Sequence, residues 1–523
     1  MRRVISRSPL LAALGWEGMG MGRGLGRFVS RFGDVRIPTG SLLSISGSIC
    51  LVHVLSGCIL GSERPELAID IPPAYRNAGA KPYAALPTYQ WWRGFRSREL
   101  TTLIEEAQQG NLDIAAAVGR ILQADAQARL AGAPLLPNVD LGGDASRSRA
   151  SRTTSSGSDG DTSRSSRSER VLYSGSLQAS YEIDFWGKNR AALRAAEENA
   201  VASRFNREVV HLTTTATVAN AFFQALAAQD QLRVARNNES SASRILDLIQ
   251  QRLQVGTASD LDIAQQESLV ATQRAAIPLL EQQLRQSIHA LAVLLGRTPE
   301  FFALRGGSMN QIAIPRVTPG LPSDVLTQRP DIRQAEALLA SANADVESAR
   351  AAFFPSISLT GQGGYQSAAL RTLFRPESLF YNVAGSLTQP IFDGGRLMGE
   401  YDLQRGRQEE LLQLYRKTII QAFADVENAL VAVQQGARRE RLQRDVVAAS
   451  RRAFGISESR LREGTIDLVT LLNTQQALFQ AEDAAAEARL AHLQAIVSLY
   501  QALGGSWIAD PPAVSNAIVT TAG

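Results

Sequence analysis

Residues 252–257 read Arg-Leu-Gln-Val-Gly-Thr, and residues 460–465 read Arg-Leu-Arg-Glu-Gly-Thr, 208 positions further on. The same offset holds at two other landmarks, which are Gly187 with Gly395 and Leu295-Gly296 with Leu503-Gly504. Because the offset is constant over about 110 residues, neither copy has a net insertion or deletion there, whereas surface loops drift in length. The sequence therefore predicts a duplicated set of rigid elements that reverse at Gly-Thr turns.

Upstream of these landmarks the offset becomes 218, since Asp113-Ile114 matches Asp331-Ile332 and Leu136-Pro137 matches Phe354-Pro355. The difference of 10 residues falls in the first copy, where residues 144–170 hold ten Ser and six Arg. We interpret this stretch as a solvated surface loop. An RNA-binding tract is the alternative, but it fits an exported chain poorly.

Composition indicates a folded protein, with 45% apolar and 20% charged residues among 523. Residues 1–57 carry seven Arg against Glu17 and Asp34, a net charge of +5. The whole chain has a net charge of +4, so residues 58–523 sum to −1. The basicity therefore belongs to the leader, and no nucleic-acid partner is expected.

The leader has the pattern of an export signal, with Arg31 and Arg36 before a mostly apolar run from Leu42 to Leu55. This run is shorter than the roughly 20 residues of a membrane-spanning helix. It ends in Leu55-Ser56-Gly57-Cys58, which resembles a bacterial lipobox and implies cleavage before Cys58 and acylation of its thiol. A chance cysteine in an ordinary signal is the alternative. After cleavage Cys58 is the only cysteine, so we expect no disulfide, no thiolate metal site and no cofactor beyond the covalent lipid.

Four segments are predicted to be strands. From Val171 to Asp184, apolar side chains alternate with Ser, Gln and Glu over 14 residues, apart from Leu172. Similar alternation begins at Ile357 and at Tyr381, and a weaker match spans 138–145. Each copy thus contributes two strands.

Very long helices follow the strands. Residues 188–255 contain neither Gly nor Pro, and a return helix is expected over 261–295 with a kink at Pro278. The second copy has no Pro from 391 to 510, with a return helix over 468–503, although four glycines interrupt it: Gly399, Gly406, Gly436 and Gly455. A single helix from about Glu99 to Leu130 precedes the first strand.

These elements divide the chain into six regions. The signal covers residues 1–57 and a lipidated, partly Pro-rich tether covers 58–98. The first repeat spans 99–296, an inter-repeat linker near the equator of the helical part spans 297–323, the second repeat spans 324–504, and a tail spans 505–523.

One apolar and one polar face per strand is typical of a membrane β-barrel with lipid outside and water inside. A sheet in lipid cannot leave its edges open, and about eight strands are needed to close a barrel. Four strands per chain therefore predict that several chains pool their strands. The helices are too polar to span a bilayer, so we expect them to continue the barrel as a hollow cylinder.

Several motifs together resemble the TolC-like outer-membrane efflux factors, and specifically the NodT-like lipoprotein channels of resistance-nodulation-division (RND) efflux systems. They are the lipobox, Trp91-Trp92-x-x-Phe95, the run Leu387-x-x-Pro390-Ile391-Phe392-Asp393-Gly394-Gly395-Arg396, and the paired Gly-Thr turns. The resemblance implies a mainly α homotrimer with a 12-stranded outer-membrane barrel and a 12-helix periplasmic tunnel. It also implies a periplasmic adaptor and an inner-membrane RND pump as partners, with the channel itself doing no chemistry.

The resemblance places adaptor docking at the two helix-to-helix turns. The residues concerned are Arg252, Leu253, Gly256 and Thr257 in the first turn, and Arg460, Leu461, Gly464 and Thr465 in the second. The glycines have an alternative explanation, because a left-handed residue ends a helix and permits a tight reversal. An Arg in the last turn also favours the negative end of the helix dipole, so both interpretations stay open for Arg252 and Arg460.

The resemblance also places a periplasmic constriction just after the second turn, with Val469 at its apolar position and Asn473 at its acidic one. The amide of Asn473 replaces a carboxylate, so we expect weaker cation selectivity, with Asp467 as a partial substitute.

An enzyme is disfavoured, because His211, His289 and His492 lie alone in helical stretches and no nucleotide or nucleophile motif is present. No metal site is expected. The alternative function is an exported coiled-coil or adhesin-like stalk, which the alternating strands and the lack of sustained heptads oppose.

Overall fold

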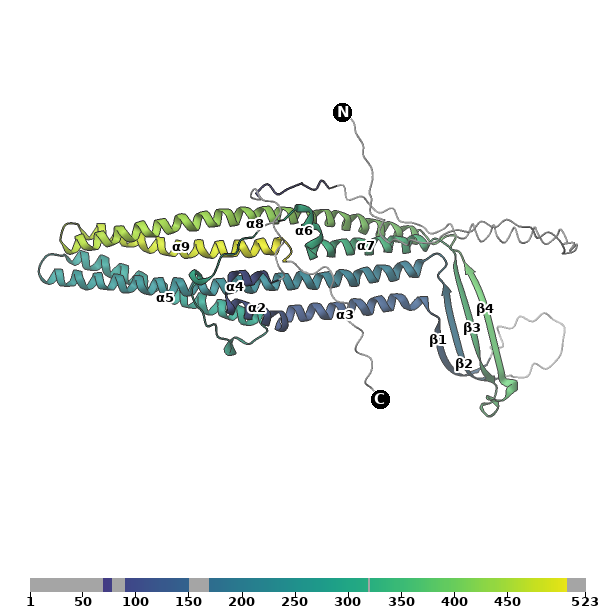
Figure 1. The fold of residues 1–523 in the computed structure, drawn as a ribbon. Helices are drawn as coiled ribbons and strands as arrows, with labels where there is room; N and C mark the ends of the chain where they lie inside the picture. Colours follow the sequence, from purple (N-terminus) through teal and green to yellow (C-terminus); the bar gives the residue numbers. More distant parts are fainter. Residues whose placement is uncertain (1–68, 78–89, 150–168, 318–319, 506–523) are drawn as a thin grey trace, which may run out of the picture. The chain divides into compact units, whose positions relative to one another are not determined.

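The computed structural model describes residues 69–77, 90–149, 169–317 and 320–505. All of them lie in one compact unit, Leu60–Gly523. This unit is mainly helical with one small sheet, as predicted (Figure 1).

The α-helices are α2 (Arg98–Gly110), α3 (Leu112–Gly132), α4 (Lys188–Gln254), α5 (Asp260–Leu294), α6 (Pro322–Gln328), α7 (Pro330–Ala351), α8 (Arg396–Arg462) and α9 (Leu468–Ala502). The strands are β1 (Asn138–Ser148), β2 (Arg170–Ile183), β3 (Ser356–Ser367) and β4 (Leu379–Thr388). Short 3₁₀ turns are η1 (Trp91–Phe95), η2 (Ala133–Leu135), η3 (Pro299–Phe301), η4 (Met309–Gln311), η5 (Leu370–Thr372) and η6 (Pro376–Ser378).

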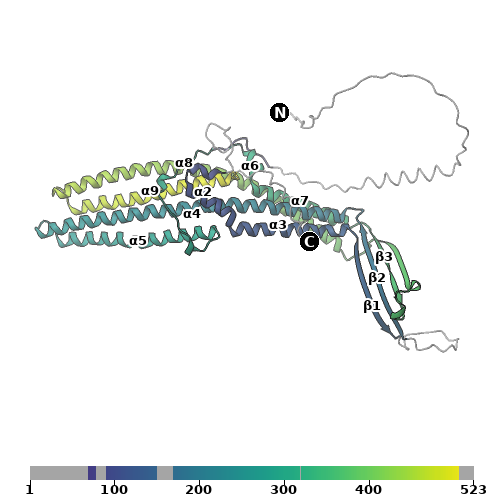
Figure 2. The ribbon, with the colours of Figure 1, turned by 60° about the horizontal axis from the view of Figure 1, so that its bottom comes forward.

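The duplication is visible in the helix lengths. Helices α4 and α8 have 67 residues each, and α5 and α9 have 35 each. Helix α4 packs against α3, α5, α7 and α9, while α8 packs against α7 and α9. The sheet lies at one end of this bundle and the α4–α5 and α8–α9 turns lie at the other (Figures 1 and 2).

Two helix expectations were wrong. Residues 98–132 form two helices rather than one, because Asn111 leaves the helical conformation and starts α3. Its side-chain oxygen accepts the N–H groups of Asp113 at 2.9 Å and Ile114 at 3.1 Å, and its amide donates to the Leu294 carbonyl at 2.8 Å. Helix α8 runs on through its four glycines, because each costs only about 1 kcal/mol and packing on α7 and α9 offsets it. Helix α5 contains Pro278 in its interior, and the kink expected there stays a prediction.

The largest core cluster joins the two repeats at mid-height. Its fully buried members include Phe95, Phe222, Phe223 and Leu493. Trp91 stacks on Tyr500 with ring centroids 4.9 Å apart. The last part of the segment interpreted as a tether is therefore buried in the helical core at η1.

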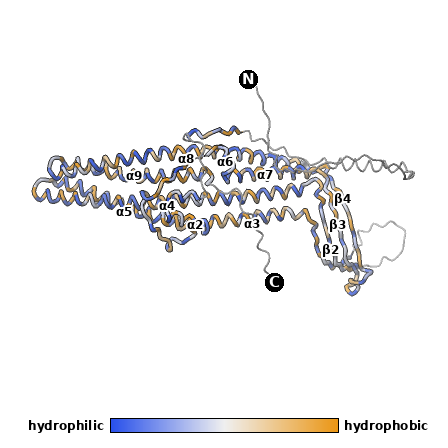
Figure 3. The backbone as a smooth tube through the Cα atoms, in the orientation of Figure 1, coloured by the Kyte–Doolittle hydropathy of each residue, from blue (hydrophilic) through white to orange (hydrophobic). Residues whose placement is uncertain are grey.

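Polar and apolar residues are interspersed along the long helices (Figure 3). Within the described part of the chain, no helix combines the length and apolar character that crossing a bilayer requires.

Candidate channel wall and helical tip

The sheet has one apolar and one polar face, and its four strands confirm the four that were predicted. The strands pair antiparallel in the order β1-β2-β3-β4, with Leu141 opposite Leu177 and Tyr181 opposite Leu359. Because the side-chain period is two, this register puts all the apolar sets on one face. That face carries Val139, Leu141, Val171, Tyr173, Leu177, Tyr181, Ile183, Ile357, Leu359, Tyr365, Leu379, Tyr381, Val383 and Leu387.

The opposite face is polar and is held together by side-chain hydrogen bonds. Gln362 donates to the Ser176 hydroxyl at 3.0 Å, and the hydroxyls of Ser358 and Ser386 lie 2.7 Å apart. Most of the remaining side chains on this face are also neutral donors and acceptors. Such a surface suits water rather than lipid.

The sheet is open at both sides. Strands β1 and β4 each pair with one neighbour only, among the strands described. Apolar side chains on these edge strands are strongly exposed, with Leu141 at 81% and Tyr381 at 83%. An exposed apolar edge strand has unpaired N–H and C=O groups that can pair with a further strand.

Aspartates start the long helices where the sheet meets the bundle. The Asp184 carboxylate accepts the N–H groups of Asn189 at 3.0 Å and Arg190 at 2.9 Å at the start of α4. Asp393 accepts from Leu397 at 2.9 Å and Gly395 at 3.0 Å at the start of α8, and these bonds hold the pKa of Asp393 below its usual range. The Asp393-Gly394-Gly395 segment is therefore a strand-to-helix turn.

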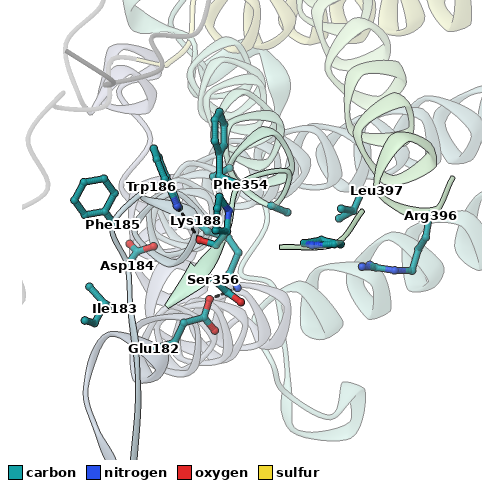
Figure 4. A pocket seen from close by; sticks show the side chains of 14 residues that line it. Glu182, Ile183, Asp184, Phe185, Trp186, Lys188, Phe354, Ser356, Arg396 and Leu397 are labelled. Carbon is teal, nitrogen blue, oxygen red and sulfur yellow. Dashed lines mark hydrogen bonds and ion pairs between the residues drawn. The ribbon is translucent and has the colours of Figure 1, made fainter. Parts of the chain in front are cut away.

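Trp186, between β2 and α4, contacts the segment between α7 and β3 and so joins the two repeats. Its indole donates to the Pro355 carbonyl at 2.8 Å, and its ring stacks on Phe354 with centroids 4.7 Å apart. A cavity of about 270 Å³ lies beside them, bordered by Lys188 and Ser356 (Figure 4). This aromatic contact was not predicted, because no sequence period marks a contact between residues 168 positions apart.

The two Gly-Thr turns have the same geometry. In the first turn the Thr257 N–H donates to the Arg252 carbonyl at 2.8 Å, and Gly256 donates to Leu253 at 2.9 Å with φ +75°. The second turn repeats this at Thr465 and Gly464, with distances of 2.9 and 3.0 Å and φ +71°. This pair of bonds is a Schellman motif, which needs a left-handed residue at the glycine. The geometry that the two turns share thus has a structural cause.

The two arginines of the tip, Arg252 and Arg460, have different environments in the structure. Arg252 donates from Nη1 to the Leu461 carbonyl at 2.9 Å and so ties the first turn to the second. Leu461 is buried in a tip cluster with Ile249 and Phe454. Arg460 is exposed. Arg252 therefore has a structural role, and Arg460 keeps its side chain available to a partner.

The residues expected at the constriction lie in the first turns of α9. Val469 and Asn473 are one turn apart and both exposed, so they share one face of the helix. Asp467 is the N-cap, where hydrogen bonds from the Thr470 hydroxyl and from its backbone N–H, at 3.0 Å, hold the pKa of Asp467 below its usual range. The Asp467 carboxylate is thus engaged in starting α9.

A buried charge cluster fixes the inter-repeat linker to the helices. The Glu440 carboxylate accepts from Arg489 Nη1 at 2.8 Å and from His492 Nδ1 at 2.6 Å. Arg489 also donates to the linker carbonyls of Ile312 at 2.7 Å and Met309 at 3.3 Å. Burial alone would raise the pKa of Glu440, but the His492 bond and the Arg489 charge lower it to about 2.

This cluster was missed at the sequence level, where His492 was noted only as a lone histidine in a helical stretch. Glu440 and Arg489 lie 49 positions apart, and no pattern in the sequence indicates that they pair. Cys58 lies outside the described residues. Among those that are described, no group of three or more potential ligands could hold a metal ion.

Comparison with known proteins agrees with this architecture. Residues 103–297 and 321–505 both match the family model for outer membrane efflux proteins. The chain belongs to the outer membrane efflux protein family. The two matched segments are the two repeats of the structure, and the family places the protein in the outer membrane with a periplasmic helical extension.

Individual relatives in the family are similar along nearly their whole length. The pyoverdine export outer membrane protein OpmQ of Pseudomonas putida is 43% identical over 86% of this chain and 94% of its own. The toluene efflux pump outer membrane protein TtgC of P. putida is 33% identical over 90% of this chain and 96% of its own. The solved outer-membrane channel OprN superposes with a TM-score of 0.79 at 25% identity, covering 86% of this chain and 99% of its own. These matches support an efflux channel rather than an adhesin-like stalk.

Proposed function

We propose that three copies of this chain form one channel. Four strands per chain would give a barrel of 3 × 4 = 12 strands, continued by a periplasmic tunnel of 12 helices. The single observation that carries this is the two-faced sheet with both edges open, because such a sheet in lipid must close through other chains. Native mass spectrometry of the detergent-solubilised protein tests it: we expect a mass of three chains, and a monomer would contradict the proposal.

In this proposal the trimer is a passive exit duct and not an enzyme. An inner-membrane RND pump supplies the energy and a periplasmic adaptor joins pump to channel at the helical tip. The support is the exposed turn surface, which includes Gly256, Thr257, Arg460, Gly464 and Thr465.

A photo-crosslinking residue at Val255, which is 73% exposed in the first turn, tests the docking site. We expect it to capture the adaptor in cells, while the same residue at buried Leu461 captures none. Capture from neither position, with the pump complex otherwise intact, would contradict docking at the turns.

We further propose that Cys58 carries the lipid that places this chain in the NodT-like lipoprotein subgroup. The support is the lipobox-like Leu55-Ser56-Gly57-Cys58 sequence. Mass spectrometry of the mature N-terminal peptide should show an acylated Cys58, and a Cys58→Ser variant should lose the added mass. An unmodified thiol on the mature protein would contradict the anchor.

Val469 and Asn473 are proposed to line the tunnel constriction. The support is their shared exposed face on α9 and the engagement of the Asp467 carboxylate at the helix start. A ring of neutral amides attracts cations less than a ring of carboxylates. We therefore expect weak block of single-channel current by trivalent cations, and strong block that survives Asp467→Ala would contradict the assignment.

The exported compound is proposed to be a siderophore of the pyoverdine class. The support is the identity of 43% to the P. putida pyoverdine export protein against 33% to the toluene efflux protein. Deleting the gene should lower iron-chelating activity in the medium and raise it inside the cell. Unchanged chelator secretion together with new sensitivity to solvents or drugs would favour those substrates instead.

A further inference from the structure

Inside one chain, helix α4 of the first repeat packs along helix α7 of the second, and three interactions mark this contact. Arg194 of α4 forms an ion pair with Glu347 of α7. Asn199 of α4 donates to the Ser341 hydroxyl of α7 at 2.8 Å. At the sheet end, Trp186 packs on Phe354. Strand β2, which precedes α4, and strand β3, which follows α7, also pair with each other.

The repeat offsets assign to each residue of this contact an equivalent residue in the other repeat, and the equivalents define a second possible contact. Adding 208 to a residue of β2–α4 gives its equivalent in β4–α8, and subtracting 218 from a residue of α7–β3 gives its equivalent in α3–β1. Arg194 then becomes Asp402, and Glu347 becomes Arg129. Both charges are reversed, so the pair remains complementary. One reversal alone would leave two like charges facing each other.

The second contact cannot form within one chain, because its two halves lie on opposite sides of the bundle. Strand β1 and helix α3 are at one side, and β4 and α8 are at the other (Figures 1 and 2). Arg129 and Asp402 are both exposed, and neither has an ion-pair partner among the described residues. The counterparts Arg194 and Glu347 do have one.

The apolar side chains around the two halves are also uncovered. Leu403 of α8 is 62% exposed, and Leu130 of α3 is 68% exposed. At the sheet end, Phe392 follows β4 with 92% exposure. Leu136, the equivalent of Phe354, precedes β1 with 71% exposure. Each half therefore presents apolar surface that a second copy of the other half would cover.

We propose that β4–α8 of one copy packs on β1–α3 of the next copy with the geometry of the internal contact, and that Asp402 pairs with Arg129 of the partner subunit. This rests on the proposed homotrimer and specifies its interface. It also fixes the strand register between chains. Gln178 pairs with Gln362 inside the chain. The repeat offsets turn Gln178 into Ser386 and Gln362 into Asp144, so Ser386 is placed opposite Asp144 of the partner subunit. Both offsets are even, so polar residues stay on the polar face.

Charge reversal tests the ion pair in the full-length protein. Arg129→Glu or Asp402→Arg alone should make the trimer dissociate faster, on the order of tenfold, because three like-charge contacts replace three ion pairs. The double variant should restore the original rate. Arg120→Glu is the matched control, since Arg120 is exposed on α3 about half a turn round the helix from Arg129 and should change nothing.

A cysteine pair tests the register. Ser386→Cys with Asp144→Cys should give disulfide-linked dimers and trimers on a denaturing gel, because directly opposed strand residues have Cα atoms about 5 Å apart. Ser386→Cys with Asp140→Cys, four residues out of register, should not. A trimer by native mass that gives neither the cross-link nor the double-variant rescue would overturn the interface alone, whereas a monomer would overturn the homotrimer as well.

Discussion

Glu440→Gln is expected to release the linker that joins the two repeats. The substitution keeps the shape of the side chain but removes the only carboxylate that faces both Arg489 and His492 in the described cluster. Arg489 is 8% exposed, so its charge would stay buried without a counter-charge. Arg489 holds the linker in place through its hydrogen bonds to the Met309 and Ile312 carbonyls. These bonds would weaken once Arg489 is no longer held by the Glu440 carboxylate.

The magnitude follows from the pKa of Glu440, which falls from 4.5 to about 2 in the folded protein. A shift of 2.5 units at 1.36 kcal/mol per unit is about 3 kcal/mol of stabilisation. Breaking a buried pair by removing one partner costs a similar amount, about 3–5 kcal/mol. Because the folded-state pKa is depressed, this stabilisation is complete above pH 4.5 and is lost as the pH falls towards 2.

Amide hydrogen exchange measures the effect locally, without requiring two-state unfolding of a large assembly. The reporter is the Ala313 N–H, which donates to the Phe95 carbonyl at 3.0 Å beside the cluster. At pH 7 its protection should fall about a hundredfold in Glu440→Gln, as about 3 kcal/mol requires. The difference from the unmodified protein should shrink steadily below pH 4.5.

The control is Glu458→Gln, which breaks the exposed pair with Arg462 and should change protection less than twofold. The reasoning would be refuted if both variants had the same small effect, or if the Glu440→Gln difference persisted unchanged towards pH 2.

Three further substitutions have defined outcomes. Gly464→Ala should lower the thermal stability of the tip by about 1 kcal/mol, because the glycine has φ +71° with open space around it; equal stability in a thermal scan would contradict the strained-turn explanation. Trp186→Ala should cost about 3 kcal/mol through the lost stacking on Phe354 and the lost bond to Pro355, seen as a lower melting temperature, while Trp186→Phe should recover part of it. Asn473→Asp should raise cation-over-anion permeability in bilayer recordings, and unchanged reversal potentials would remove Asn473 from the constriction.

Much of the fold follows from periodicity. Alternation at Val171–Ile183 predicted both the strand and its polar and apolar faces, because each residue's face depends only on its parity. The absence of Gly and Pro after Lys188 predicted a helix that the structure ends within one residue of the expected position. The repeat offset predicted matching turns at Gly256 and Gly464, because equal lengths place the turns at the same height.

Periodicity and repeat offsets did not predict the individual tertiary contacts. The break at Asn111 depends on a bond to the distant Leu294 carbonyl, and the same sequence reads locally as continuous helix. The Glu440–Arg489 pair joins residues that have no common period. The family resemblance named Arg252 as a docking residue, but its bond to Leu461 depends on how two turns 208 residues apart meet in space.

The central claim is that each chain supplies only part of a pore wall and that association of copies creates the pore. Single-channel recording of the purified full-length protein in a planar bilayer tests it most directly. We expect discrete conductance steps from protein fractions that contain the three-chain species and none from fractions of separated monomer. Conductance carried by the monomer fraction, or no conductance from an intact trimer, would contradict the account.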